Sequence, residues 1–176
     1  NQGSLCWKSC TLIKKTLKGT KSLSNRDSIT KLIKTVSAKD ISFRTLYRGY
    51  SLLVTMPCWN EESKVGPSVR SVPRDLVDCI CVVDNGSIDN TANEAEESGA
   101  LVISHTVNLG AGGGIRTGLE YGRTNNYDLL AVLAGDNQDD PNDLYRAVDK
   151  IIDDNLDYIQ GSRWLSEGKR ENMTLS

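Results

Sequence analysis

The sequence of 176 residues has a single histidine, His105, and an odd number of cysteines, five. A tetrahedral zinc site needs four ligands and a disulfide framework needs paired cysteines, so the composition supports neither. No apolar run approaches the ~20 residues that would cross a bilayer, and the N-terminal segment mixes lysines with Ser and Thr where a signal peptide would be apolar. We therefore expect a chain from a reducing compartment, with neither a membrane span nor a signal peptide.

Positive charge is concentrated in one part of the chain. Residues 1–50 hold 11 lysines and arginines and two acidic residues, whereas residues 51–176 hold 10 and 21. This division predicts a basic leader over 1–50, loosely ordered or with short helices, and one folded domain over 51–176. Apolar residues in Ser28–Val36 have the spacing of a short helix. The leader suits anionic lipid headgroups better than nucleic acid, and a solvated tail is the alternative.

From Ser51 onward, apolar runs alternate with segments of helical periodicity in the order βαβαβαβαβ. Strands are predicted at 51–56, 78–83, 100–104, 128–133 and 157–160, and helices near 61–71, 90–98, 112–123 and 140–154. Cys79 and Cys81, two apart in a strand, are expected as buried thiols on one face. Strands joined by crossover helices predict an α/β fold with a mostly parallel sheet, helices on both faces, and ligands beyond the carboxyl ends of the strands.

The first two predicted strands end in polar turns. Pro57 is expected to stop the ladder of the first strand, and Asn60 to cap the helix that follows. After the second strand, Asp89 or Asn90 is expected to cap the next helix. Asp84 is different, because a carboxylate at the tip of an apolar strand needs donors, which a nucleoside base N–H or a ribose hydroxyl would supply.

Glycines follow the third predicted strand, and oxygen ligands follow the fourth. The small residues from Gly110 to Gly118 would let backbone N–H groups approach a diphosphate at a helix start, and close packing of that helix on the sheet explains them equally well. Asp136 and Gln138 offer hard oxygen ligands for Mg²⁺ or Mn²⁺, whose shell a nucleotide diphosphate would complete. Asp140, followed by Pro141, is equally explained as the start of the next helix.

Taken in order, the motifs resemble one family. They are Pro57-x-x-Asn60-Glu61, Val82-Val83-Asp84-Asn85-Gly86-Ser87-x-Asp89-x-Thr91, Asn108-x-Gly110, Gly135-Asp136-Asn137-Gln138-x-Asp140-Pro141 and Gly161-Ser162-Arg163-Trp164. The pattern covers about residues 51–173 and is similar to the family 2 inverting glycosyltransferases, above all to the dolichol- and polyprenyl-phosphate sugar synthases. The resemblance implies a GT-A fold, in which a Rossmann-like nucleotide half is joined to an acceptor half, and a UDP- or GDP-sugar donor used with Mg²⁺ or Mn²⁺.

The resemblance also implies roles for individual residues. It assigns the nucleotide to Pro57, Trp59, Glu61, Asp84, Gly110 and Gly112, the metal and diphosphate to Asp136 and Gln138, and the acceptor phosphate to Arg163. Asp136, Arg163 and Asp140 are the catalytic candidates, with Asp140 as the general base that a hydroxyl acceptor would need. In place of the family's Asp-x-Asp metal motif stands Ala134-Gly135-Asp136, without the first carboxylate. Because the family continues beyond the Arg163 motif, we also expect a donor-binding half whose own transfer activity is poor.

We therefore expect a glycosyltransferase that moves the sugar, with inversion, to polyprenyl or dolichyl phosphate or to a growing glycan. An acceptor phosphate is favoured because it is already ionised and needs little help from a base. The expected location is cytoplasmic, peripheral on the cytoplasmic membrane face or beside a membrane-embedded partner. A non-catalytic module that binds a nucleotide-sugar or serves in assembly is the alternative. A nicotinamide-dependent oxidoreductase is disfavoured, because the first strand leads to Pro57-Cys58-Trp59-Asn60 and not to a glycine fingerprint.

Overall fold

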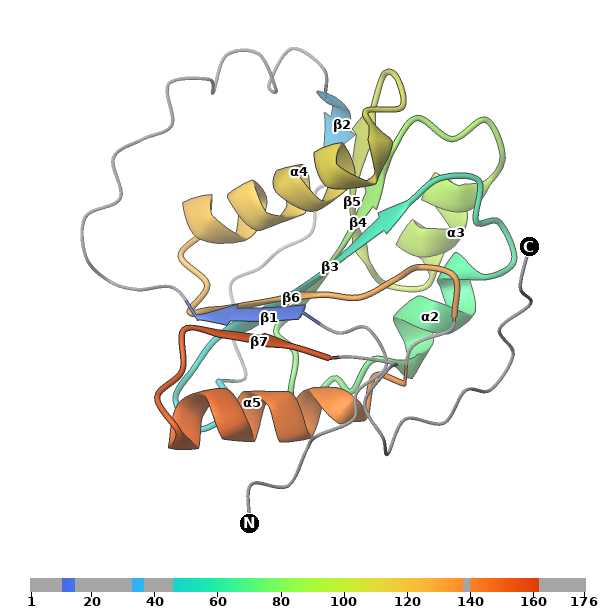
Figure 1. Ribbon diagram of the computed structural model, residues 1–176. Coiled ribbons are helices and arrows are strands. Elements are labelled where there is room, and N and C mark those ends of the chain that lie inside the picture. Colours follow the sequence, from blue (N-terminus) through green and yellow to red (C-terminus); the bar gives the residue numbers. More distant parts are fainter. Residues whose placement is uncertain (1–10, 15–32, 37–45, 138–139, 162–176) are drawn as a thin grey trace, which may run out of the picture.

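The computed structural model describes residues 11–14, 33–36, 46–137 and 140–161, and in these it has helices on both faces of one seven-stranded sheet (Figure 1). The strands are β1 (Thr11–Lys14), β2 (Ile33–Val36), β3 (Leu52–Cys58), β4 (Cys79–Asp84), β5 (Leu101–His105), β6 (Leu129–Val132) and β7 (Tyr158–Gln160). The helices are α2 (Val65–Ser71), α3 (Thr91–Glu97), α4 (Gly110–Thr124) and α5 (Asp143–Asp153). Each predicted strand and helix after residue 50 is present, with its bounds shifted by a few residues.

The order of the strands defines where a ligand can bind. The sheet runs β2-β5-β4-β3-β6-β1-β7, and its central strands β5, β4, β3 and β6 are parallel to one another. The chain therefore winds outward from β3 in one direction to β5, and then crosses to the other side of β3 to form β6. Such a switch point opens a crevice beyond the carboxyl ends of the strands. The predicted α/β class with a mostly parallel sheet is confirmed.

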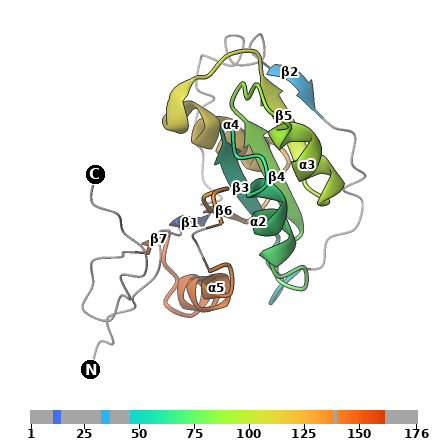
Figure 2. The ribbon, with the colours of Figure 1, turned by 90° about the vertical axis from the view of Figure 1, so that its right-hand side faces the viewer.

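Alternation along β3 divides the core into two layers. Leu52, Val54, Met56 and Cys58 belong to the cluster that packs against α2, α3 and α5, whereas Leu53 belongs to the cluster beneath α4. Successive side chains of a strand point to opposite faces, so one apolar strand supplies both clusters. Figure 2 shows α4 on one side of β3 and β4 and α3 on the other. Cys79 and Cys81 are buried free thiols on the α4 side, as predicted.

The backbone of α4 lies directly on β3. A Cβ at Gly118 would lie 1.8 Å from Oγ1 of Thr55, so even alanine does not fit without movement of the helix. Close approach of this kind requires glycine. For this part of α4 the packing explanation of the glycines is therefore confirmed, and it is the start of the helix that remains available for a ligand.

Two sequence expectations are corrected. Residues 33–36, the end of the helix predicted over Ser28–Val36, form the edge strand β2, antiparallel to β5; residues 28–32 lie outside the described part. Three of the four residues in Ile33–Val36 are β-branched, namely Ile33, Thr35 and Val36, and such residues suit a strand. Pro57 does not stop β3 but pairs with Val83 inside it. Its missing N–H is tolerated because that side of β3 faces β6, whose ladder with β3 has already ended at Val132.

The strand β1 lies inside the sheet although its residues belong to the basic leader. It lies between β6 and β7 and is antiparallel to both, with Leu12 opposite Ala131 on one side and Ile159 on the other. Leu12 is fully buried and belongs to the core cluster that includes α5. Its apolar run is too short and too rich in neighbouring lysines to be recognised as a strand from the sequence. Within the described residues, β7 therefore joins the sheet only through β1.

Because β1 connects two ladders, Leu12→Ala should destabilise the protein by about 2–5 kcal/mol, as expected for a fully buried leucine. The matched control is Leu46→Ala, since Leu46 is 47% exposed and lies outside the sheet. Urea denaturation followed by circular dichroism measures both free energies of unfolding. Equal losses for the two variants would show that β1 is not part of the cooperative core.

Candidate functional site

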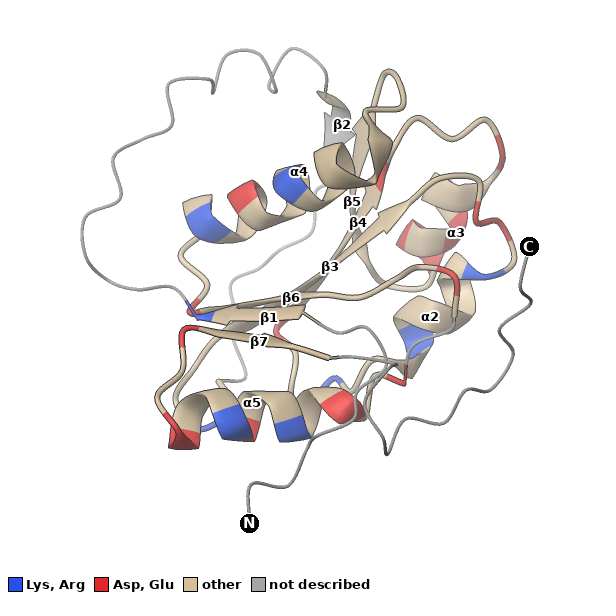
Figure 3. Ribbon diagram, viewed as in Figure 1, with Lys and Arg blue, Asp and Glu red and all other residues tan. Residues whose placement is uncertain are grey.

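The loops after β3, β4 and β5 begin at the same level of the sheet. Cys58 at the end of β3 pairs with Asp84 at the end of β4, and Asp84 pairs with Ser104 near the end of β5. Figure 3 shows acidic residues in the loops that follow β3, β4 and β6, all on the same side of the molecule. Groups far apart in the sequence are thus brought together at the edge where the topology opens a crevice.

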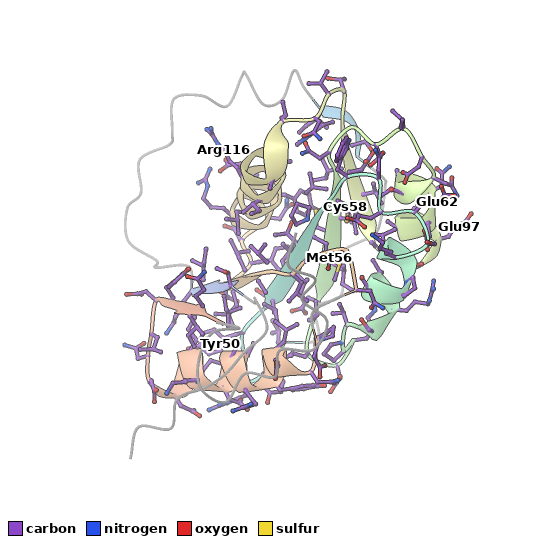
Figure 4. The ribbon with its side chains drawn as sticks, turned by 45° about the vertical axis from the view of Figure 1, so that its right-hand side comes forward. Tyr50, Met56, Cys58, Glu62, Glu97 and Arg116 are labelled. Atoms are coloured by element: carbon purple, nitrogen blue, oxygen red, sulfur yellow. The ribbon has the colours of Figure 1, made fainter. Side chains whose placement is uncertain are left out.

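Electrostatics at Cys58 report how closely these acids gather. Figure 4 shows Cys58 near the centre of the molecule, at the end of β3, and the residue is buried. Burial, as the largest cause, and the negative charges of Glu61, Asp84, Asp136 and Asp89 together raise the pKa of its thiol to about 12. Carboxylates from three different loops therefore surround one point. A divalent cation would be attracted to this edge of the sheet.

A recess of about 410 Å³ lies beyond the ends of β4 and β5. Its walls include Asp84, Asn93, Ser104 and His105. This volume falls in the range of ordinary small-molecule sites, about 300–1,000 Å³. The recess lies at the same carboxyl edge of the sheet as the crevice that the strand order predicts, but beyond β4 and β5 and not at the switch point between β3 and β6.

Asp84 differs from the aspartates at the opposite edge of the sheet. Asp78 accepts the N–H groups of Leu46 and Leu52, and Asp128 accepts both the N–H and the hydroxyl of Ser51, so these two carboxylates fasten the starts of strands. Asp84 is only 5% exposed, and its Oδ1 accepts the N–H of Ser87 at 3.0 Å. One hydrogen bond is little for a carboxylate, which has about four acceptor positions. Asp84 therefore retains acceptor capacity toward the recess that it lines.

The loop after β3 does not cap α2 in the predicted way. Asn60 has a positive φ of 53°, and its Oδ1 accepts the N–H of Ile88 in the next loop at 3.0 Å. The helix starts only at Val65, after Lys64. The prediction that Asn60 caps α2 is wrong, because a partner distant in sequence takes its side chain.

Side chains of the β4–α3 segment bind the backbone of that same loop. The N–H of Glu61 is donated to Oγ1 of Thr91 at 2.8 Å, and the N–H of Glu62 is donated to Asp89 at 3.1 Å. Glu94 accepts the N–H of Ser63 at 2.6 Å. Asp89 also accepts the N–H of Thr91, but the N-cap position of α3 is Asn90, whose side chain makes no cap hydrogen bond, so neither residue caps the helix in the expected way. These side chains therefore shape the loop that carries Trp59 and Glu61.

Asn85 performs the same task for the loop between β5 and α4. It is 3% exposed, its Nδ2 donates to Oδ1 of Asn108 and to the carbonyl of Gly110, and its Oδ1 accepts the N–H of Leu109. Gly110 has φ +75°, a conformation that favours glycine, and α4 begins there. Both nitrogens of His105 are bonded as well, Nδ1 to Asn85 at 2.8 Å and Nε2 to Thr117 at 2.9 Å. The sequence singled out neither residue for a role, because their partners lie 12–25 positions away.

The remaining predicted nucleotide residues lie in the loop after β3 and in or beneath the start of α4, and they do not line the recess. Trp59 is 53% exposed in the loop after β3, and Glu61 forms an ion pair with Lys64 at 2.9 Å. Gly112, in the first turn of α4, has open space where a Cβ would be. Pro57 packs beneath α4, since a Cβ at Gly114 would lie 2.9 Å from Cβ of Pro57.

Asp136 follows β6 in a loop that α2 holds in place. Oγ of Ser68 donates to the carbonyl of Gly135 at 3.1 Å, beside Asp136. Asp140 is exposed and accepts the N–H and the amide of Asn142, both at 3.0 Å. Helix α5 begins at Asp143, so Pro141 is not its first residue. The expected metal ligand Gln138 and the expected acceptor residue Arg163 both lie outside the described residues.

Among the residues that the structure describes, no group of three or more His, Cys, Asp or Glu side chains could hold a metal ion. Mg²⁺ and similar ions usually take one or two carboxylates and complete their shell with waters and substrate phosphates. Asp136, close enough to Cys58 and Lys64 to raise the pKa of both groups, supplies one such carboxylate. The described residues therefore fit a metal that is held jointly with a diphosphate, and not a metal held by protein ligands alone.

Comparison with known proteins decides the family. The model of the Glycosyl transferase family 2 matches residues 53–176. The chain belongs to this family. One relative is a UDP-N-acetylglucosamine–dolichyl-phosphate N-acetylglucosaminyltransferase from Methanococcus voltae, 29% identical over 71% of this chain and 57% of that protein. Another is a dodecaprenyl-phosphate galacturonate synthase from Rhizobium johnstonii, 31% identical over 64% of this chain and 36% of that protein.

A solved member shares the fold. Glucosyl-3-phosphoglycerate synthase from Mycobacterium tuberculosis, crystallised with Mn²⁺, UDP and phosphoglyceric acid, is 26% identical over 59% of this chain and 39% of that chain, with a TM-score of 0.50. The predicted GT-A glycosyltransferase fold is confirmed by this likeness. The family 2 chain described here spans about half the length of the curated relatives that it matches.

Asp89 offers a test of how the loop after β3 is held. Burial opposes its ionisation, but hydrogen bonds from Thr91 and from the N–H of Glu62 outweigh this and lower the pKa of the carboxyl. Asp89→Ala should therefore cost about 1–2 kcal/mol of stability at pH 7, because the N–H groups of Glu62 and Thr91 lose a charged acceptor. Glu97→Ala, at an exposed position of the same helix, is the control.

The effect of Asp89 should depend on pH. Because the pKa of Asp89 is lower in the folded protein than in the unfolded chain, where it is about 4, the ionised carboxylate stabilises the fold. This stabilisation is complete at pH values above the unfolded-state pKa, and it is lost as the pH falls through the folded-state pKa. The stability difference between the wild type and Asp89→Ala should therefore narrow in acid. Urea denaturation between neutral and acid pH measures it, and a difference that is constant or widens in acid would contradict the assignment.

Proposed function

We propose that this chain binds the nucleoside diphosphate of a UDP- or GDP-sugar at the carboxyl edge of its sheet and contributes this site to a sugar transfer. The observation that carries the proposal is the recess beyond β4 and β5, where the buried Asp84 retains acceptor capacity. Membership of the glycosyltransferase family supports the reaction class. The relatives' named activities support a sugar nucleotide as the donor.

The nucleoside is proposed to occupy the recess. A base presents N–H donors and a ribose presents hydroxyls, and either can donate to the carboxylate of Asp84. Trp59, exposed in the neighbouring loop, provides an aromatic surface at the rim of the site. The open backbone at Gly110 and Gly112 lies at the start of α4, where the helix dipole and the N–H groups that follow Gly110 favour a phosphate; the N–H of Gly110 itself is donated to Oδ1 of Asn108.

The metal is proposed to join the protein to the diphosphate. Asp136 would be its ligand in the described part of the chain, and Gln138 is the proposed second ligand. When bound, Mg²⁺ or Mn²⁺ would stabilise the negative charge of the leaving diphosphate. The M. tuberculosis synthase was crystallised with both Mn²⁺ and UDP, which supports this pairing.

The transfer is proposed to invert the anomeric carbon. An oxygen of the acceptor attacks that carbon as its bond to the diphosphate oxygen breaks, and the electron pair of that bond leaves with the nucleoside diphosphate. A lipid phosphate is the favoured acceptor, because it needs no general base and because both relatives described above carry a polyprenyl phosphate in their names. A hydroxyl acceptor would need a base, for which Asp140 is the candidate, and Arg163 is proposed to meet an acceptor phosphate.

A site beside a membrane would suit such a lipid acceptor, with the chain peripheral on the cytoplasmic face or beside a membrane-embedded partner. Within the described residues, no helix is both long and apolar enough to span a bilayer. The lysines and arginines of the leader support attraction to anionic headgroups. A module that binds a nucleotide-sugar without turnover is the second candidate, favoured by Ala134 where the family's first metal-binding carboxylate would stand.

Asp84→Asn tests the nucleoside site. It should weaken UDP or GDP binding about 10- to 100-fold, the usual effect of losing a hydrogen bond to a charged group. Asp75→Asn is the control, since Asp75 is exposed before the amino end of β4 and accepts the hydroxyl of Tyr145. Isothermal titration in the presence of Mg²⁺ measures both affinities. If Asp84→Asn binds nucleotide as tightly as Asp75→Asn, Asp84 is not in the site.

Metal and nucleotide should bind cooperatively. With few protein ligands, Mn²⁺ alone should bind weakly, and UDP should tighten its binding at least about tenfold, with an equal effect of Mn²⁺ on UDP. Asp136→Asn should remove this mutual gain. Electron paramagnetic resonance of free Mn²⁺ measures its binding with and without UDP. Equal Mn²⁺ affinity in both cases would overturn the proposed shared shell.

A further inference from the structure

His105 and Asn85 form a buried hydrogen-bond chain that connects β5 to the start of α4. His105 is 2% exposed and Asn85 is 3% exposed. On one side, Nε2 of His105 meets Oγ1 of Thr117 in the middle of α4, at 2.9 Å. On the other, Nδ1 meets Oδ1 of Asn85 at 2.8 Å, and Asn85 bonds to the loop that begins α4. These hydrogen bonds thus connect the end of β5 both to the middle of α4 and to the loop before it.

The partners of Asn85 determine which way its amide points. Its Oδ1 faces the N–H of Leu109, which can only donate, and its Nδ2 faces the carbonyl of Gly110, which can only accept. The same Nδ2 donates to Oδ1 of Asn108 at 2.9 Å. A flipped amide would set donor against donor and acceptor against acceptor. The side chain therefore has one orientation, with both hydrogens directed at the loop.

This orientation determines the state of His105. Because Oδ1 of Asn85 can only accept, Nδ1 of His105 carries a hydrogen and donates it. Burial lowers the pKa of His105, although Asp84 opposes this, so the ring is neutral at pH 7. Its Nε2 then accepts from the hydroxyl of Thr117 at 2.9 Å, and the same hydroxyl lies 3.2 Å from the carbonyl of Gly113, so its one hydrogen is shared between two acceptors. Each polar atom of the two side chains has a partner.

We infer that His105 and Asn85 are positioning residues for the diphosphate of the donor. The inference rests on the proposed function, in which the start of α4 receives the diphosphate. Asn85 fastens three consecutive residues there, Asn108, Leu109 and Gly110, and Oδ1 of Asn108 in turn accepts the N–H of Gly110 at 2.7 Å. His105 in turn donates from Nδ1 to Oδ1 of Asn85 and so fixes the side-chain amide of Asn85. Through these hydrogen bonds, the buried His105 influences the direction of the first N–H groups of α4.

The backbone of the loop makes such fastening necessary. Gly110 has φ +75° and open space around its Cβ position, so its conformation is not enforced by packing. The N-cap residue of α4, Leu109, has no side-chain cap, and the N–H of Gly110 is held by Oδ1 of Asn108. Anion binding at a helix start depends on how its N–H groups are directed. The rigidity that the glycines do not provide comes from Asn85 and His105.

Two substitutions at His105 separate its two hydrogen bonds. An Asn side chain places a donor near the position of Nδ1, and a Gln side chain places one near the position of Nε2. His105→Asn thus retains the bond to Asn85, whereas His105→Gln retains only the bond to Thr117. Both variants are neutral and polar, so they differ mainly in the contact under test. Asn108→Ala applies the same test at an exposed position, where folding is not in question.

The measured quantity is the ratio of the dissociation constant of uridine to that of UDP, with Mg²⁺ present. It isolates the contribution of the diphosphate, which loss of overall stability would not change. The wild type should bind UDP much more tightly than uridine. In His105→Gln and Asn108→Ala the ratio should fall about tenfold, as expected for loss of a buried hydrogen bond. His105→Asn should keep the wild-type ratio, and uridine affinity should be similar in all four proteins.

The outcomes separate this inference from the proposed function. A wild type that binds UDP no better than uridine would contradict the diphosphate site itself. A wild type with a high ratio that persists in both His105→Gln and Asn108→Ala would overturn the positioning role and leave the site intact. Equal loss in His105→Asn and His105→Gln would also overturn it, because the effect would then follow from altered packing and not from the bond to Asn85.

Discussion

The segment from Asn85 to Glu94 holds the loops on both sides of it. Toward β3 it accepts backbone N–H groups through Asp89, Thr91 and Glu94, and toward β5 Asn85 bonds the loop at the start of α4. Parallel strands end at one edge, where the polar backbone leaves the ladder and needs new partners. In this protein the segment from Asn85 to Glu94 supplies these hydrogen-bond partners, so the same segment fixes the loops on both sides of the candidate site. The shape of the recess therefore depends on side chains that need not touch a ligand.

Sequence reasoning succeeded where chemistry is local. Apolar runs such as Leu52–Cys58 specify buried parallel strands through residue type alone, and the strand order then places Asp84 at the edge where ligands bind. It failed where a distant partner decides. The sequence position of Asn60 is typical of a helix cap, but in the structure its Oδ1 accepts the N–H of Ile88 instead. Strand β1 has too few apolar residues to be recognised without its two neighbours in the sheet. His105 ends an apolar strand, which was the available signal that its ring is buried.

The glycine-rich stretch shows how one pattern serves two purposes. Gly118 brings α4 onto β3, where Thr55 leaves no room for a Cβ, while Gly110 and Gly112 leave the start of the helix open. Sequence periodicity alone does not separate these roles, because both require the absence of a side chain. Figure 4 shows Arg116 on the outer side of α4, away from the sheet, so the helix presents backbone and not this charged side chain at the inner face.

The central claim is that a nucleoside diphosphate with its metal binds at the carboxyl edge of the sheet. Hydrogen–deuterium exchange of the whole chain, with and without UDP and Mn²⁺, tests it most directly, because it reports binding by position along the backbone. The account predicts slower exchange in the loops over 59–64, 85–90 and 106–113, and no change over 73–78 at the opposite edge. Protection confined to other segments, or none at saturating UDP and Mn²⁺, would contradict it.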